Sequence, residues 1–259
     1  MPSSAGQRSF PNTRWSVVLA ATRRASPESA SALETLCGTY WYPLYAYVRR
    51  SGQTPQDAQD LTQEFCRLLE KQWFNLANPE KGRLRTFLIV ALKHFMAKEW
   101  RRTSAQRRGG GRAHSQLDTA VAESRYAVET SALPADEAFD QQWALTLLDL
   151  TVNRLREEFT AAGKPGEFEV LKSSLMADRG AIDYAAVARG LGSNEGAARV
   201  AVHRLRKRFR EVYREEISQT LADGADLDGE LRYLAAALAR RSSWERQLEP
   251  RNIRNTPND

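Results

Sequence analysis

The sequence has few of the side chains that build metal centres or nucleophilic active sites. Its 259 residues include two cysteines and three histidines, at Cys37, Cys66, His94, His114 and His203. These positions have neither metal-ligand nor catalytic-triad spacing, and two isolated cysteines are typical of reduced thiols in a cytosolic protein. The glycines at 109–111 are not followed by the Lys–Ser/Thr pair of a phosphate-binding loop. We therefore expect a protein that is not an enzyme and that uses no metal and no cofactor.

Long apolar runs and alternating β-type patterns are also scarce. No segment approaches the roughly 18 apolar residues of a membrane helix, and residues 1–15 lack the apolar core of a secretion signal. We therefore expect a cytoplasmic protein. Ala, Leu, Arg and Glu dominate the chain, and its apolar residues recur at helical spacing, which predicts an all-α fold.

Positive charge is in excess. The chain has 38 Lys and Arg against 32 Asp and Glu, which gives a formal net charge of +6. An excess of this kind favours a polyanionic partner and says nothing about the fold.

The helical patterns fall into two groups that a polar segment separates. Residues 103–137 include the run Arg107–Arg112, whose three glycines are typical of a flexible linker. We therefore expect two helical domains joined by that linker, with a short additional helix over 15–24. The predicted organisation is an N-terminal extension (1–29), a helical domain (30–102), the linker (103–137), a second helical domain (138–220), and a C-terminal extension with one helix and a disordered tail (221–259).

Residues 183–210 carry the most informative pattern. A short apolar helix over 184–191 is followed by Gly192, Ser193 and Asn194 and then by a helix that is strongly basic from 199 to 210. Gly192 suits the left-handed backbone at the end of a helix, and Ser193 or Asn194 suits the N-cap of the next one. Two helices joined in this way are typical of a helix-turn-helix DNA-binding motif. The alternative is an amphipathic surface helix with a solvated basic face.

The basic helix has two distinct faces. One is an apolar stripe at 4-3 spacing, made of Ala198, Val202, Leu205, Phe209 and Val212. Arg199, His203 and Arg206 fall on another face, which we expect to be left free for a DNA groove.

The helix expected over 55–70 has an acidic stripe beside its apolar face. Asp57, Asp60 and Glu64 follow a 3-4 spacing, with Arg67 next in the same row. Because an acidic stripe repels DNA, it is either an ordinary solvated face or a docking surface for a protein.

The order of these segments resembles the extracytoplasmic-function class of bacterial RNA polymerase sigma factors, over roughly 30–102 and 138–216. DAQDLTQEFCRLL (57–69) is similar to that family's polymerase-docking helix, and GRLRTFLIVALKHFMAKEWRR (82–102) to its −10 promoter helix. DYAAVARGLGSNEGAARVAVHRLRKRFR (183–210) is similar to its −35 helix-turn-helix. The two extensions resemble larger members of the class. The partners this implies are core RNA polymerase, promoter DNA, and a regulatory protein or the chain's own extensions.

The resemblance implies three groups of contact residues. Those for the clamp of core polymerase are Asp57, Asp60, Gln63, Glu64 and Phe65. Those for the −10 element are two loop asparagines for a flipped base, Asn75 and Asn78, together with Arg83, Arg85, Lys93, His94, Lys98, Arg101 and Arg102. Those for the −35 element are Ser193, Asn194, Glu195, Arg199, His203, Arg204, Lys207 and Arg208. Of the last group, Glu195, Arg199 and His203 suit base contacts, and Arg204, Lys207 and Arg208 suit phosphates.

Some features depart from the family or leave other interpretations open. His94 and Glu99 stand where the family often has asparagine and aspartate, and we expect Trp100 in the core. The basic helix end at Arg101 and Arg102 also complements a helix dipole without any DNA. A helix-turn-helix regulator that acts without polymerase is the main alternative function, and an RNA-binding helical protein is another.

Overall fold

The structure is a computed structural model that describes residues 27–71, 82–106, 122–124, 126, 133–178, 180–222 and 224–248. Within these ranges every regular element is a helix, apart from an isolated antiparallel bridge between Arg83 and Leu221. The predicted all-α fold is therefore confirmed. No helix in these ranges has the combination of length and apolarity that crossing a bilayer requires. The helix expected over 15–24 lies outside the described residues.

The helices agree closely with the sequence pattern. In chain order they are α2 (Pro27–Arg50), α3 (Pro55–Lys71), α4 (Leu84–Gln106), α6 (Ala135–Ala161), α7 (Pro165–Leu171), the 3-10 turn η3 (Lys172–Ser174), α8 (Tyr184–Gly190), α9 (Glu195–Ser218) and α10 (Leu227–Leu248). Local chemistry explains the boundaries. At the start of α3, for example, the Thr54 hydroxyl accepts the Asp57 N–H at 3.2 Å and donates to the Asp57 carboxylate at 2.7 Å.

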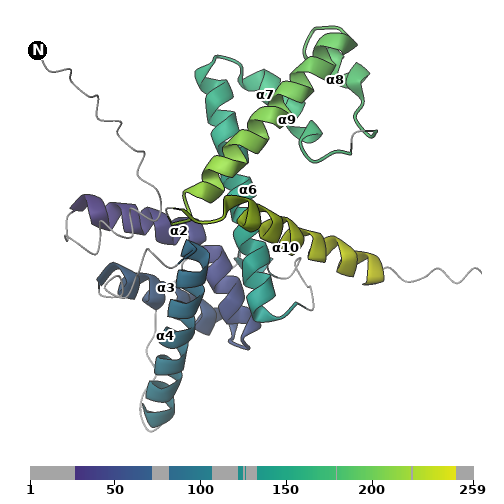
Figure 1. Ribbon diagram of the computed structural model, residues 1–259. Helices are drawn as coiled ribbons and strands as arrows, with labels where there is room; N and C mark the ends of the chain where they lie inside the picture. The colour runs from purple at the N-terminus through teal and green to yellow at the C-terminus, as the bar shows by residue number, and fades with distance from the viewer. Residues whose placement is uncertain are drawn as a thin grey trace, which may run out of the picture.

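The first hydrophobic core lies in the lower part of Figure 1 and joins α2, α3 and α4 to the first half of α6, the end of α9, and α10. Tyr40 of α2 and Trp143 of α6 are both fully buried there. Their rings stack with centroids 4.0 Å apart and planes inclined by 10°, which adds about 0.5–1.5 kcal/mol to the burial of their area. This contact fixes α6 to the N-terminal helices. We call this part of the molecule the lower lobe.

The second core lies in the upper part of Figure 1, between α7, α8, α9 and the second half of α6. Leu155 and Phe168 are fully buried in it, and they pack with Ala198, Val202 and Leu205 of α9. The apolar stripe predicted for α9 is therefore a packing face. We call this part the upper lobe.

Helix α6 belongs to both lobes. Its 27 residues extend over about 40 Å at a rise of 1.5 Å per residue, and in Figure 1 it runs through the middle of the molecule. Phe139, Trp143 and Leu147 lie in the first core and Leu155 in the second. The sequence assigns 138–220 to a separate second domain, whereas the residues of this range up to Leu147 pack in the first core. The two lobes thus share one continuous helix.

Parts of the predicted linker 103–137 are ordered against the lower lobe. Helix α4 continues to Gln106 and α6 begins at Ala135. Between them, Glu123 accepts hydrogen bonds from the Tyr45 hydroxyl and from Arg49 Nε, the latter at 2.7 Å. The hydrogen bond from Arg49 holds the pKa of Glu123 below its ordinary value. This part of the predicted linker is therefore attached to α2.

Candidate nucleic-acid interface

The turn between α8 and α9 has the backbone geometry that the sequence predicts. Gly192 has φ of +60°, a left-handed value that favours glycine. The N–H of Ser193 donates to the Ala188 carbonyl at 2.9 Å, and the N–H of Gly192 donates to the Arg189 carbonyl at 3.2 Å. These two bonds form a Schellman motif that ends α8. The direction of the chain into α9 is therefore set by local hydrogen bonds.

Helix α9 has a side-chain N-cap, and α8 packs closely against α7. Of the two candidates for the N-cap, Asn194 takes the position, and its Oδ1 accepts the Ala197 N–H at 2.9 Å. On α8, a Cβ added at Gly190 would lie 2.9 Å from the Val170 side chain of α7. Glycine therefore permits the close approach of these two helices. The helix-turn-helix unit of α8 and α9 is therefore packed on the rest of the upper lobe.

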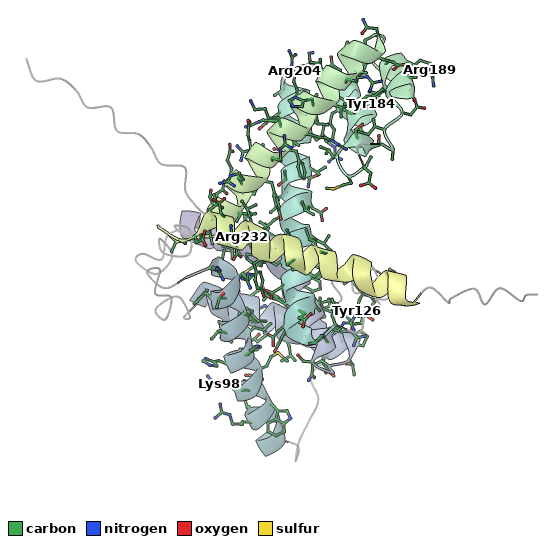
Figure 2. The ribbon with its side chains drawn as sticks, turned by 45° about the vertical axis from the view of Figure 1, so that its right-hand side comes forward. Lys98, Tyr126, Tyr184, Arg189, Arg204 and Arg232 are labelled. Carbon is green, nitrogen blue, oxygen red and sulfur yellow. The ribbon has the colours of Figure 1, made fainter. Side chains whose placement is uncertain are left out.

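The outer face of this unit is basic and open to solvent. Figure 2 shows Arg189 and Arg204 projecting from the upper lobe. Every candidate for a −35 contact except Arg208 is exposed, namely Ser193, Asn194, Glu195, Arg199, His203, Arg204 and Lys207. Within the described part of the chain, Arg204 and Lys207 make no ion pair. This face has the charge and accessibility that a phosphate backbone requires.

Two neighbours hold the Arg199 guanidinium in place. Its Nη2 lies 3.2 Å from Glu195 Oε2, one turn earlier on α9. Its Cζ lies 4.3 Å from the centre of the Tyr184 ring, at the start of α8. Sequence reasoning missed Tyr184, because a single aromatic residue at a helix start has no periodicity that links it to a residue fifteen positions later. Both side chains of this ion pair are more than half exposed, so Arg199 remains accessible to a ligand.

Arg206 does not lie on the open face with Arg199 and His203. Its Nε and Nη2 donate to the Ser174 carbonyl at 2.8 and 2.6 Å, and Nη2 also donates to the Ala177 carbonyl. The guanidinium therefore satisfies the carbonyl group of the last residue of η3 and that of Ala177 beyond it. The expectation that Arg206 faces a groove is wrong, because these carbonyl groups come from a turn that the helical pattern does not show.

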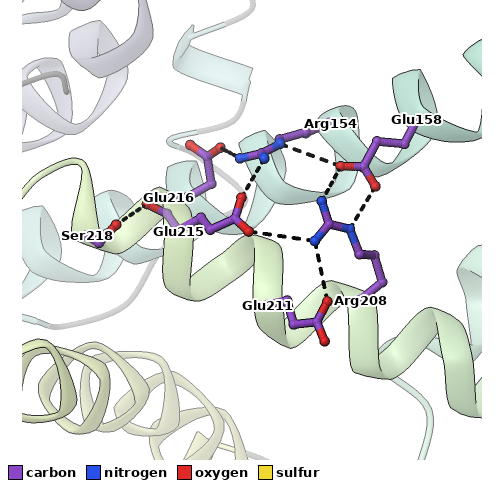
Figure 3. Close-up of polar contacts among 7 residues, drawn as sticks. All are labelled: Arg154, Glu158, Arg208, Glu211, Glu215, Glu216 and Ser218. Carbon is purple, nitrogen blue, oxygen red and sulfur yellow. Dashed lines mark hydrogen bonds and ion pairs between the residues drawn. The ribbon is translucent and has the colours of Figure 1, made fainter. Parts of the chain in front are cut away.

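Arg208 is committed to carboxylates, as Figure 3 shows. It forms a two-pronged contact with Glu158 of α6, at 3.0 Å from Nε and 2.7 Å from Nη2. Glu211 and Glu215 lie 3.4 and 3.6 Å from its Nη1. Arg154 of α6 pairs with Glu158 and Glu215 from the other side, and also with Glu216 (Figure 3). Arg208 thus holds α9 against α6, and this corrects its assignment as a phosphate contact.

The outer part of α4 forms a second basic surface, at the bottom of the lower lobe where Figure 2 labels Lys98. His94, Lys98, Arg101 and Arg102 are all exposed there. Trp100 is 72 % exposed among them, so the expectation that it packs in the core is wrong. An exposed indole beside cationic side chains suits stacking on an unpaired base.

Two further basic candidates, Lys93 on α4 and Arg83 directly before this helix, pair with acidic side chains. Lys93 Nζ lies 2.6 Å from Asp136 of α6, and this hydrogen bond raises the pKa of Lys93. Arg83 Nε lies 2.8 Å from Glu230 Oε2 of α10. Both cations are partly exposed, so they border the basic surface of α4 and do not lie at its centre. Asn75 and Asn78, the candidates for a flipped base, lie outside the described residues.

Arg85 is a structural residue. It is only 7 % exposed, and its Nε donates to Glu230 Oε1 at 3.0 Å while Nη1 donates to Asp140 Oδ1 at 2.7 Å. The Tyr233 ring lies 4.3 Å from its Cζ. Burial alone would lower the pKa of Arg85, but the hydrogen bond to Glu230 and the charge of Asp140 raise it overall. A phosphate cannot reach this guanidinium, which corrects the prediction for Arg85.

The acidic stripe of α3 lies on the outside of the lower lobe. Asp57 and Glu64 are exposed, and Asp60 is half-buried. Glu64 pairs only loosely with Arg67, at 3.6 Å, and both side chains are about half exposed. Such a pair adds little stability and leaves the carboxylates accessible. The stripe is therefore available to a cationic partner.

The remaining two candidates on α3 differ from that stripe. Phe65 is 1 % exposed and its ring lies 5.8 Å from that of Phe95, so it is a core residue and does not face a partner. Gln63 is half-buried, and its Nε2 is a buried donor without a hydrogen-bond acceptor among the described residues. The expectation that Phe65 contacts core polymerase is wrong, because the apolar face of α3 lies next to the acidic stripe and Phe65 belongs to the apolar face.

Comparison of the chain with protein-family models, curated proteins and solved structures finds no match. Among the residues that the structure describes, no three His, Cys, Asp or Glu side chains are grouped as metal ligands. The surfaces themselves are therefore the basis for a function: two exposed basic surfaces at opposite ends of the molecule, and an acidic stripe on α3.

Proposed function

We propose that this protein is an RNA polymerase sigma factor of the extracytoplasmic-function class. It binds core polymerase through the acidic stripe of α3 and contacts promoter DNA through the outer face of α4 and the N-terminal part of α9. It works by recognition and carries out no chemistry of its own. Its partners are thus core polymerase and DNA, and both are cytoplasmic.

The observation that carries the proposal is the geometry of the α8–α9 unit. The Schellman turn and the Asn194 cap direct the first turns of α9 outward. Arg199, His203, Arg204 and Lys207 are exposed along that part of the helix. A helix that enters the major groove by its N-terminal part needs this arrangement. Arg199 suits a bidentate contact with guanine, and Arg204 and Lys207 suit phosphates.

The lower lobe supports the more specific part of the proposal. A regulator that only binds duplex DNA has no use for an acidic surface, whereas a polymerase-binding subunit needs one for basic groups on its partner. Trp100 and the basic residues of α4 combine stacking with phosphate contacts, as single-stranded DNA requires. These features suit a protein that holds an opened −10 element.

Run-off transcription with purified core polymerase on genomic DNA tests the proposal. We expect discrete transcripts that depend on this protein and start downstream of a shared sequence element. The matched control is the variant Asp60→Arg/Glu64→Arg, which retains both basic surfaces and reverses the charge of the acidic stripe. Transcripts that are equally abundant without the protein would refute the proposal.

The second candidate is a helix-turn-helix regulator that acts without polymerase. The observation that favours it is that the α8–α9 unit has its own core and an accessible basic face. Copurification with core polymerase separates the two functions, because the regulator has no reason to bind the enzyme through α3. Tight operator binding without copurification would select the second candidate.

A further inference from the structure

Val200 is an exposed apolar residue in the middle of the basic surface of α9. Its side chain is 49 % exposed, and it is not part of either hydrophobic core of the described residues. Valine is β-branched and is a weaker helix former than alanine or leucine. Neither packing nor helix propensity therefore accounts for a valine at this position.

Val200 occupies the centre of the outer face of α9. It stands two positions from the buried residues Ala198 and Val202, so it lies about 160° around the helix from each of them. His203 and Arg204, one turn later, are exposed on either side of it, and Figure 2 shows Arg204 projecting from the upper lobe. The side chain that points directly away from the core in this turn of α9 is therefore apolar.

The centre of this face is the part that reaches the bases when a helix enters the major groove. The groove is about 12 Å wide, and a helix with its side chains is about 10–12 Å across. The middle of the outer face therefore meets the edges of the bases, while flanking cations such as Arg204 lie nearer to the phosphates. Val200 is thus placed against a base edge.

The chemistry of valine selects one feature of the base edges. Valine has no hydrogen-bonding group in its side chain, and the apolar feature of the major groove is the C5 methyl group of thymine. Against a polar edge group, valine would remove water without offering a hydrogen bond, which costs free energy. The β-branched side chain has one preferred rotamer in a helix, so its methyl groups are fixed before binding. Gly196, one turn earlier, is exposed and has no side chain, so a base edge can approach the helix there.

We propose that Val200 determines base specificity by contacting the methyl group of a thymine in the DNA that α9 binds. The inference rests on the proposed function only for DNA binding by α9, which the second candidate function shares. It adds an apolar contact at the centre of the face to the polar contacts expected from Arg199. Because the methyl group is what is recognised, a 5-methylcytosine at the same position is expected to bind better than cytosine.

The contact is measured as a cycle between the Val200 side chain and the methyl group. A bound duplex is selected from a random pool with the full-length protein, alone and together with core polymerase. Each thymine of the selected site is then replaced with uracil, which lacks only the methyl group. We expect one position at which uracil lowers the affinity of the unaltered protein by about fourfold, the effect of one buried methyl group. In Val200→Ala, the same replacement should have a much smaller effect.

Two controls separate this contact from a general loss of binding. Lys207→Ala changes another exposed residue of the same helix, and we expect it to weaken duplexes with thymine and with uracil equally. A second pair of duplexes carries cytosine or 5-methylcytosine at the sensitive position, and only the unaltered protein should distinguish them clearly. Circular dichroism should show that Val200→Ala keeps its helical content, because the side chain is exposed and alanine is the better helix former.

Three results would overturn the contact: a selected site without thymine, no position at which uracil weakens binding, or an equal loss in the unaltered protein and in Val200→Ala. Failure of the proposed function has a different signature. If the protein alone selects a duplex but supports no transcription with core polymerase, the sigma-factor proposal is refuted and the cycle still decides the contact. A protein that selects no duplex, alone or with core polymerase, contradicts both.

Discussion

Replacing Arg85 with methionine is the most direct energetic test of the structure. The substitution keeps an unbranched apolar stem and removes the guanidinium with its charge. Glu230, which is 1 % exposed, then retains only Arg83, and Asp140 loses the guanidinium that binds it at 2.7 Å. The variant therefore leaves buried negative charge without full compensation.

The expected cost follows from the burial of these groups. Removing one partner of a buried ion pair destabilises a protein by about 3–5 kcal/mol, because the other charge stays desolvated. The control Arg102→Met acts on the same helix, but the side chain of Arg102 is 61 % exposed in its ion pair with Glu99 at 3.3 Å. Losing an arginine that is this exposed is expected to cost below about 1 kcal/mol. The expected loss in the free energy of unfolding is thus several times larger for Arg85→Met than for Arg102→Met.

The single variant Glu230→Leu and the double variant Arg85→Met/Glu230→Leu complete a double-mutant cycle. The double variant removes the buried charges of Arg85 and Glu230, and the partly exposed Arg83 can turn to solvent. Asp140 stays buried and keeps only the hydrogen bond from the Tyr233 hydroxyl among these partners. We expect this variant to be more stable than Arg85→Met alone, so that the two effects are far from additive. Urea denaturation followed by circular dichroism measures the unaltered protein, the single variants Arg85→Met and Glu230→Leu, the double variant, and the control Arg102→Met. A loss in Arg85→Met no larger than in Arg102→Met, or additive losses in the double variant, would refute the reasoning.

The other predictions concern the surfaces and the pH dependence. Asp60→Arg with Glu64→Arg should abolish copurification with core polymerase and leave the helical circular dichroism unchanged; normal copurification would exclude docking through α3. Arg199→Ala should relax base preference at one −35 position by roughly 1–3 kcal/mol, whereas Lys207→Ala should weaken all sequences equally and lower the salt dependence by about one unit. Binding to promoter variants over a salt range measures both, and the reverse pattern would require a different orientation of α9. The hydrogen bond from Arg208 lowers the pKa of Glu158 from its ordinary value of 4.5. The stability that this interaction adds is therefore complete above pH 4.5, and it is lost as the pH falls through the lowered pKa of the folded state. Unfolding curves at several pH values should therefore show a weaker acid dependence in Glu158→Gln, and equal dependence would contradict this assignment.

The sequence by itself determined the helices and the turn between α8 and α9. These depend on interactions within a few residues, such as the left-handed backbone at Gly192, the cap at Asn194, and the spacing of apolar residues along α9. Such interactions are the same wherever the segment lies in the molecule, so a pattern in the sequence is enough to predict them. The exposure of the acidic stripe on α3 follows from the same periodicity.

Only the tertiary structure decided which basic residues are available to a ligand. Arg85 and Arg101 lie on the same helix, yet the first is buried and the second is exposed. The difference comes from Glu230, which is 145 positions away from Arg85 in the chain. In the same way, Arg208 is held by Glu158 of α6 and Arg206 by the carbonyl groups near η3.

The division of the chain into lobes has the same physical origin. The polar composition of 103–137 indicates a linker, but composition cannot show that the helix following it will extend into two cores. Trp143 stacks on Tyr40 because α2 and α6 meet in three dimensions. In the same way, Glu230 of α10 pairs with Arg83 and Arg85, which lie far away in the sequence. Burial of a charge or a ring depends on all the elements around it, and that information appears only when the chain is folded.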